Sequence, residues 1–150
     1  MPIAHCGACQ TYFGRLVGAG MYLRFTVPVK DADSGSPTGV FTAAYTLLDS
    51  GELAEYEQAR LRELLDWFVE HLRVPPCLKD AQNPRAICWF GAEAREHLAK
   101  VWELVWLLRE NGVIVRMETA AAVGDVVYAD AFQVAATPWR DRRGKRRWRR

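Results

Sequence analysis

The residues best suited to chemistry lie at the C-terminal end of the chain, where arginine dominates. Residues 138–150 hold eight of the twenty Lys and Arg residues but only one of the eighteen acidic residues. This segment therefore carries a formal charge of +7, against −5 for residues 1–137. An arginine side chain binds phosphate oxygens through paired hydrogen bonds, and a tryptophan ring such as Trp139 or Trp148 can stack on an unpaired base.

We therefore expect the C-terminal segment to contact nucleic acid or another polyanion. The predicted contact residues are Arg140, Arg142, Arg143, Lys145, Arg146, Arg147, Trp148, Arg149 and Arg150. Like charges repel and the segment has little apolar surface to bury, so we predict that residues 138–150 are disordered when unbound. The competing interpretations are a solvated tail, a contact for the acidic part of the same chain, and an anionic lipid surface.

The cysteines are the next candidates for chemistry, because Cys6 and Cys9 form a Cys-x-x-Cys motif. Such a motif supplies half of a structural zinc site, and His71 with Cys77 is the only other half that the spacing suggests. No pattern in the sequence brings the two halves together. A nucleophilic pair of Cys77 and His71 lacks a third residue to orient it. We therefore predict no catalytic residue, metal or cofactor, and leave open whether Cys6 and Cys9 bind a metal.

Three carboxylates near the C-terminal strands define an alternative function. Glu118, Asp125 and Asp130 flank two short apolar runs, and carboxylates grouped at strand ends hold metal ions in hydrolases. A small metal-dependent hydrolase or nuclease requires these side chains to converge on a pocket. Aspartate is also an ordinary residue of hairpin turns, and this second interpretation is the stronger one.

Two tryptophans at the edges of apolar helical stripes suggest a protein contact. Trp67 and Trp106 are the residues through which we expect a protein partner or a homodimer. A protein-interaction domain that acts through such exposed aromatic residues is the third functional hypothesis. His71 and His97 fall on the polar sides of their helices and are interpreted as solvated.

The elements that must position these residues are organised around residues 85–117. A strand is predicted for residues 86–90, a helix for 92–110 and a second strand for 113–117, with the helical stripe formed at spacings of three and four. Asn111 and Gly112 provide the stop signal of the helix. A unit of this kind usually places its two strands parallel in one sheet.

The remaining elements complete an α+β fold. Residues 22–29 alternate as a half-buried strand, residues 31–39 form a turn-rich loop, and residues 40–48 and 52–72 are amphipathic helices. Residues 125–129 and 132–136 read as a hairpin. The sequence thus predicts a mixed sheet of about five strands with three helices packed on one face, in the order β-α-α-β-α-β-β-β.

We expect residues 21–137 to form a single domain between two terminal segments. Residues 1–20 show no periodicity and are expected to be flexible or absent from the natural product, and residues 138–150 form the basic tail. No apolar run is long enough for a membrane span, and no secretory signal is found, so the expected location is the cytoplasm. The leading hypothesis is a small non-catalytic binding or adaptor module, although whether the protein is an enzyme stays open.

Overall fold

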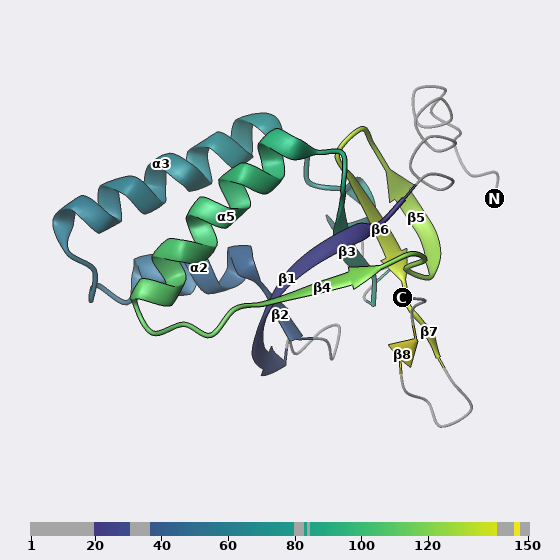
Figure 1. The fold of residues 1–150 in the computed structure, drawn as a ribbon, viewed down its shortest axis with the longest axis horizontal. Helices are drawn as coiled ribbons and strands as arrows, with labels where there is room; N and C mark the ends of the chain where they lie inside the picture. Colours follow the sequence, from purple (N-terminus) through teal and green to yellow (C-terminus); the bar gives the residue numbers. More distant parts are fainter. Residues whose placement is uncertain (1–19, 31–36, 80–82, 84, 141–145, 148–150) are drawn as a thin grey trace. The chain divides into compact units, whose positions relative to one another are not determined.

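The computed structural model describes residues 20–30, 37–79, 83, 85–140 and 146–147. Within this part, the chain forms two compact units. The helical unit contains Arg24–Val74 and Arg95–Glu118, and the strand unit contains the described residues up to Leu23, from Pro75 to Ala94 and from Thr119 onward. Figure 1 shows the elements along the chain. The 1–20 segment falls outside the described residues except for Gly20, which is exposed.

The helical unit is built from α2 (Val40–Asp49), α3 (Glu55–His71) and α5 (Arg95–Glu110). Helices α3 and α5 lie side by side (Figure 1), and their facing stripes are buried. All three predicted helices are therefore confirmed. The fully or almost fully buried side chains of this unit include Phe25, Ala44, Leu61, Leu64, Leu65, Val101, Leu104, Val105 and Leu108.

Both long helices begin three residues later than their periodicity predicted. Helix α3 starts at Glu55 because Ala54 takes an extended conformation as its N-cap, and the Glu57 carboxylate accepts a hydrogen bond from the Ala54 N–H at 3.1 Å. That bond is the acidic half of a capping box, so it satisfies one N–H that the helix itself leaves open. In the turn before this helix, the Ser50 hydroxyl accepts a hydrogen bond from the N–H of Glu52.

The end of α5 explains why the following strand lies further along the chain than predicted. Gly112 has a φ of +80°, and the Val113 N–H returns to the carbonyl of Leu108, so Val113 still belongs to the helix cap. The carbonyl of Val115 accepts a hydrogen bond from the Arg109 guanidinium at 2.8 Å. Strand β4 therefore covers Arg116–Ala120, and the prediction of a strand over residues 113–117 is correct only at its end.

Strand β1 (Tyr22–Lys30) confirms the predicted strand, and Phe25 packs edge-on against the Trp102 ring of α5 at 5.1 Å between centroids. The region predicted as a loop ends in a short strand, β2 (Pro37–Gly39), which pairs antiparallel with β1. The register shifts between Val27 and Lys30, on either side of Pro28, which has no N–H to donate to a ladder. Residues 31–36 lie outside the described part of the chain.

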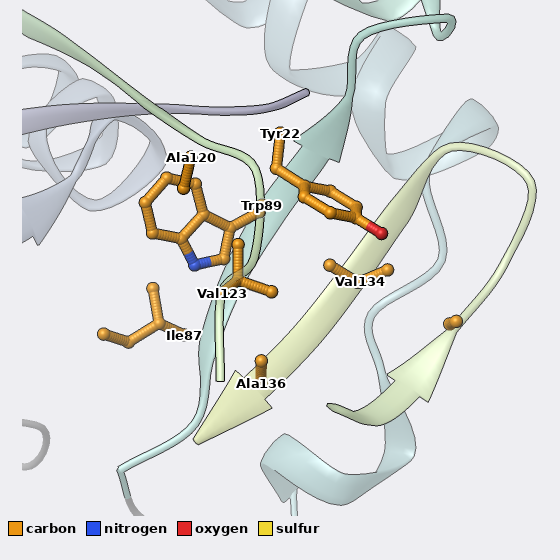
Figure 2. Packing of buried hydrophobic residues seen from close by; sticks show 8 residues of the cluster. Tyr22, Ile87, Trp89, Ala120, Val123, Val134 and Ala136 are labelled. Atoms are coloured by element: carbon orange, nitrogen blue, oxygen red, sulfur yellow. The ribbon is translucent and has the colours of Figure 1, made fainter. Parts of the chain in front are cut away.

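The strand unit is centred on β3 (Ile87–Gly91) and β6 (Gln133–Thr137), which pair antiparallel. Strand β5 (Asp125–Ala129) pairs with the other edge of β6, so the predicted hairpin is confirmed to within one residue. The short helix α4 (Pro76–Lys79) precedes β3 in the chain. Side chains of β3, β5 and β6 form one core cluster with Tyr22, Ala120 and Val123. Figure 2 shows the Trp89 indole among Ile87, Ala120 and Val123.

The hydrogen-bonded strand order is β2-β1-β3-β6-β5, with β4 also paired to β1. The α+β class and a sheet of about five to six strands are thus confirmed, and the pairings with a resolved register are antiparallel. Strands β3 and β4, predicted to be parallel strands of one unit, do not pair with each other, because β1 takes β4 as its neighbour. A separate two-stranded ladder, β7 (Trp139–Arg140) with β8 (Arg146–Arg147), follows β6.

Candidate functional site

The basic C-terminal segment is only partly described by the structure. Trp139 pairs with Arg147 and Arg140 with Arg146 in the antiparallel ladder of β7 and β8. Arg140 is exposed. The other predicted contact residues, Arg142, Arg143, Lys145, Trp148, Arg149 and Arg150, lie outside the described residues. The ladder gives residues 139–140 and 146–147 a paired backbone, whereas the disorder predicted for the rest of 138–150 stays a prediction.

The start of this segment is tied to strand β5 through a side-chain hydrogen bond. The indole N–H of Trp139 donates to Oδ1 of Asp125 at 3.0 Å. Asp125 is in register with Thr137, the last residue of β6, so Trp139 follows two residues beyond the position opposite Asp125. Diagonal neighbours of this kind are within reach of aromatic side chains. The base-stacking role suggested for Trp139 therefore competes with a contact inside the strand unit.

A glycine lets the two strands come this close. Gly124 precedes Asp125 with a φ of +124°, and a Cβ atom placed on it would lie 2.8 Å from the carbonyl carbon of Thr137 and 2.9 Å from Cα of Pro138. Contacts at these distances do not occur for real Cβ atoms. The absence of a side chain at this position thus permits the start of β5 to run against the end of β6, next to the root of the basic segment.

The carboxylate of Asp130 is occupied by the turn between β5 and β6. Its Oδ1 accepts the backbone N–H groups of Phe132 and Gln133 at 2.8 and 3.0 Å. Its Oδ2 accepts the Tyr128 hydroxyl at 2.9 Å and the Gln133 side-chain amide at 3.1 Å. This is the arrangement expected of a turn aspartate, so the geometry of Asp130 agrees with the turn interpretation.

Glu118, the third carboxylate of the hydrolase hypothesis, has one oxygen, Oε2, that is buried without a hydrogen-bond partner. The hypothesis requires Glu118, Asp125 and Asp130 to act together on a metal ion. Among the residues that the structure describes, however, no group of three or more His, Cys, Asp or Glu side chains is arranged to hold one. Cys6 and Cys9 lie outside that part of the chain, and Cys77 and Cys88 are half-buried.

The two predicted contact tryptophans differ in their surroundings. Trp67 is half-buried, stacks on the His71 ring at 4.3 Å between centroids, and meets the rings of Phe68 and His97 edge-on. Trp106 has 63% of its surface exposed. Of the pair, Trp106 therefore offers the larger apolar surface to a partner, because most of the Trp67 ring is used within the helical unit.

His97 is buried, with 4% of its surface exposed, so its assignment to a solvated face was wrong. Its Nε2 lies 2.8 Å from the carbonyl oxygen of His71, in the last turn of α3, and donates to it. The last carbonyl groups of a helix lack intrahelical partners, and His97 satisfies one of them across the α3–α5 interface. His71 is exposed as expected, and its Nδ1 donates to the Trp67 carbonyl at 2.8 Å. The His97 side chain thus links α5 to the end of α3, whereas the His71 side chain bonds within α3.

A shallow hollow of about 580 Å³ lies along the outer side of α3. Its lining residues all belong to that helix and are mostly charged: Ala59, Arg62, Glu63, Asp66, Trp67 and Glu70. One helix cannot enclose a ligand on its own, and Glu63 is already paired with Arg60 at 2.7 Å. The hollow therefore lacks the convergent polar groups of a small-molecule site.

The described helices contain no segment long and apolar enough to cross a membrane. Comparison of the chain with protein-family models, with curated proteins and with solved structures gives no match. The function must therefore be inferred from the residues themselves.

Proposed function

We propose that this protein is a small non-catalytic binding module whose basic C-terminal segment contacts nucleic acid or another polyanion. The observation that carries the proposal is the concentration of charge: residues 138–150 carry +7 in a chain whose remaining residues carry −5. Such a segment attracts phosphate groups, and each phosphate that it neutralises releases counterions into solution.

The paired backbone of β7 and β8 supports this proposal. Their register puts Arg140 opposite Arg146, and like charges at facing positions of an antiparallel pair destabilise it. A bound anion removes that repulsion, so a polyanion should favour the ladder. Arginine at these positions also suits phosphate better than lysine does, because its planar group makes two parallel hydrogen bonds.

The test compares the complete chain with a variant in which all eight basic residues of 138–150 are replaced by glutamine. Binding to labelled duplex DNA, single-stranded RNA and heparin is measured by fluorescence anisotropy over a range of salt concentrations. For duplex DNA, log K should fall with log salt with a slope of about −7 if all eight cations contact phosphates. The glutamine variant should lose measurable binding.

A variant in which the seven arginines of the segment are replaced by lysine serves as the matched control. It keeps the charge but loses the planar fork, so it should bind with a similar salt slope and lower affinity. The proposal is wrong if the glutamine variant binds as tightly as the unaltered chain, or if the unaltered chain binds none of the three polyanions at low salt.

The exposed indole of Trp106 supports a second candidate, a protein contact or homodimer made by α5. Tryptophan is enriched at the centres of protein interfaces, and a ring with 63% of its surface exposed has most of its apolar area available. Sedimentation analysis of the unaltered chain and of Trp106→Ala measures this directly. If both proteins sediment as monomers at all concentrations, the homodimer is excluded. If a protein partner binds Trp106→Ala as well as it binds the unaltered chain, Trp106 is excluded as the contact.

A further inference from the structure

The bond between Asp125 and Trp139 links two residues for which the sequence suggested separate external ligands. The distance of 3.0 Å between indole nitrogen and carboxylate oxygen is that of a well-formed hydrogen bond. Trp139 is half-buried, whereas Asp125 and Arg140 are exposed. The bond therefore lies at the surface of the strand unit, one residue before the first arginine of the basic segment.

The backbone around this bond gives it a fixed geometry. Strands β5 and β6 are in register from Asp125 opposite Thr137, and Gly124 lies against the backbone of Thr137 and Pro138. Pro138 has no N–H and cannot donate to a continued ladder. After β6 ends, the Trp139 indole supplies a donor to β5 in place of the missing backbone bond, so the chain stays attached to β5 as far as residue 139.

We propose that Asp125 is a positioning residue that acts through Trp139 to fix the root of the basic segment for polyanion binding. This inference rests on the proposed function. Fixing Trp139 reduces the conformational freedom of Arg140 before any ligand binds, and a segment that is ordered in advance loses less entropy on binding. The N–H of Trp139 is held by Asp125 and does not serve as a donor to a base edge, so the ligand class is one recognised by its backbone phosphates.

The same carboxylate also acts against binding, because a negative charge beside the segment repels phosphate. Two substitutions of Asp125 distinguish the effect of the hydrogen bond to Trp139 from the effect of the negative charge. Asp125→Asn keeps an oxygen that accepts the indole hydrogen bond but removes the charge. Asp125→Ala removes both the charge and the acceptor. The two variants have equal net charge, so any difference in affinity between them reports the hydrogen bond.

The experiment measures anisotropy of labelled duplex DNA with the complete chain and both variants. Asp125→Asn should bind as tightly as the unaltered chain or more tightly. Asp125→Ala should bind about fivefold more weakly than Asp125→Asn, the effect of losing one hydrogen bond of ordinary net strength. The salt slopes of the two variants should agree, because the cations that contact phosphate are the same in both. Asp66→Asn, at an exposed position of α3, controls for the change in net charge.

A second readout does not need a ligand. The indole N–H resonance of Trp139, assigned by its loss in Trp139→Phe, should exchange with solvent faster in Asp125→Ala than in Asp125→Asn. Equal exchange in the two variants overturns the inference, and so does equal affinity for DNA. If the unaltered chain binds no polyanion while the exchange rates differ, the proposed function fails and the positioning role in binding fails with it, although the hydrogen bond itself stands.

Discussion

Gly124→Ala is the substitution for which the structure yields the sharpest expectation. The added methyl group would lie 2.8 Å from the carbonyl carbon of Thr137, 2.9 Å from Cα of Pro138 and closer still to the carbonyl oxygen of Thr137. These are backbone atoms, so no rotation of a side chain relieves the collision. The φ of +124° is a second obstacle, because residues with a Cβ atom rarely adopt it.

The backbone cost and the packing cost are similar in size but differ in source. Holding alanine in a sparsely populated backbone region costs about 1–3 kcal/mol. Forcing extra volume into a packed site costs about 1–3 kcal/mol more, since strands β5 and β6 must move apart. The expected loss of about 2–6 kcal/mol is a large part of the total stability of an ordinary domain, which is about 5–15 kcal/mol.

Gly112→Ala is the matched control, because Gly112 also has a positive φ, +80°, but apart from its chain neighbours no atom of the described residues lies within 4 Å of its added Cβ. It should show only the backbone cost. The free energy of unfolding of both variants is measured by urea denaturation followed by circular dichroism. If Gly124→Ala loses no more stability than Gly112→Ala, the close approach of β5 and β6 at Thr137 is refuted.

Three further outcomes are expected. Leu108→Ala should lower the free energy of unfolding, measured by urea denaturation, by about 2–5 kcal/mol, because Leu108 is fully buried. If it loses no more stability than a substitution at an exposed residue, the assignment of Leu108 to the core is wrong. Asp130→Ala should lower the free energy of unfolding by about 1–3 kcal/mol, because the hydrogen bonds of the turn are lost, and should leave any hydrolytic activity unchanged. If this variant is as stable as the unaltered chain but has lost hydrolytic activity, the metal-dependent alternative is supported. Burial raises the pKa of the Tyr22 phenol above its ordinary 10.0. The contribution of the protonated phenol to the free energy of unfolding is therefore complete below pH 10 and is lost as the pH rises through the raised pKa. The unfolding free energy of Tyr22→Phe should accordingly fall less steeply at alkaline pH, and parallel pH profiles refute this.

The helices were predictable because their information is local. The buried residues of α5 recur at spacings of three and four, and Gly112 stops the helix at the residue where its signal predicts. The starts of α3 and α5 were less predictable, because an N-terminus is defined by its cap. Ala54 gives no capping signal of its own, and the acceptor that closes the turn is the side chain of Glu57.

The burial of His97 was missed although the spacing contained it. Ala94, His97, Val101, Leu104 and Leu108 form one stripe at intervals of three and four, and each of them is buried. The polar character of histidine led to the opposite assignment. A histidine within an apolar stripe is a candidate for a buried hydrogen bond, here with the carbonyl of His71. That acceptor belongs to another helix, so no local pattern identifies it.

The start of β4 depended on hydrogen bonds that the composition of residues 113–117 does not reveal. Residues 113–117 have the β-branched composition of a strand, but the Val115 carbonyl is taken by Arg109 and the Val113 N–H by the helix cap. Backbone groups that are already satisfied cannot join a ladder, so the strand begins where both groups become available. Composition indicated a strand here, and the hydrogen bonds determined the residue at which it begins.

In the candidate site, too, the residue types suggested roles that the contacts in the structure did not match. Asp125 was weighed as a metal ligand and Trp139 as a surface for a base, and each hypothesis treated its residue as available to an external partner. In the structure the two residues satisfy each other at 3.0 Å. A carboxylate that accepts an indole N–H has less capacity for a metal, and an indole whose N–H is bound is held in one orientation. Each of the two residues therefore already has a structural partner, and the polyanion proposal rests on the arginines, which begin one residue later at Arg140.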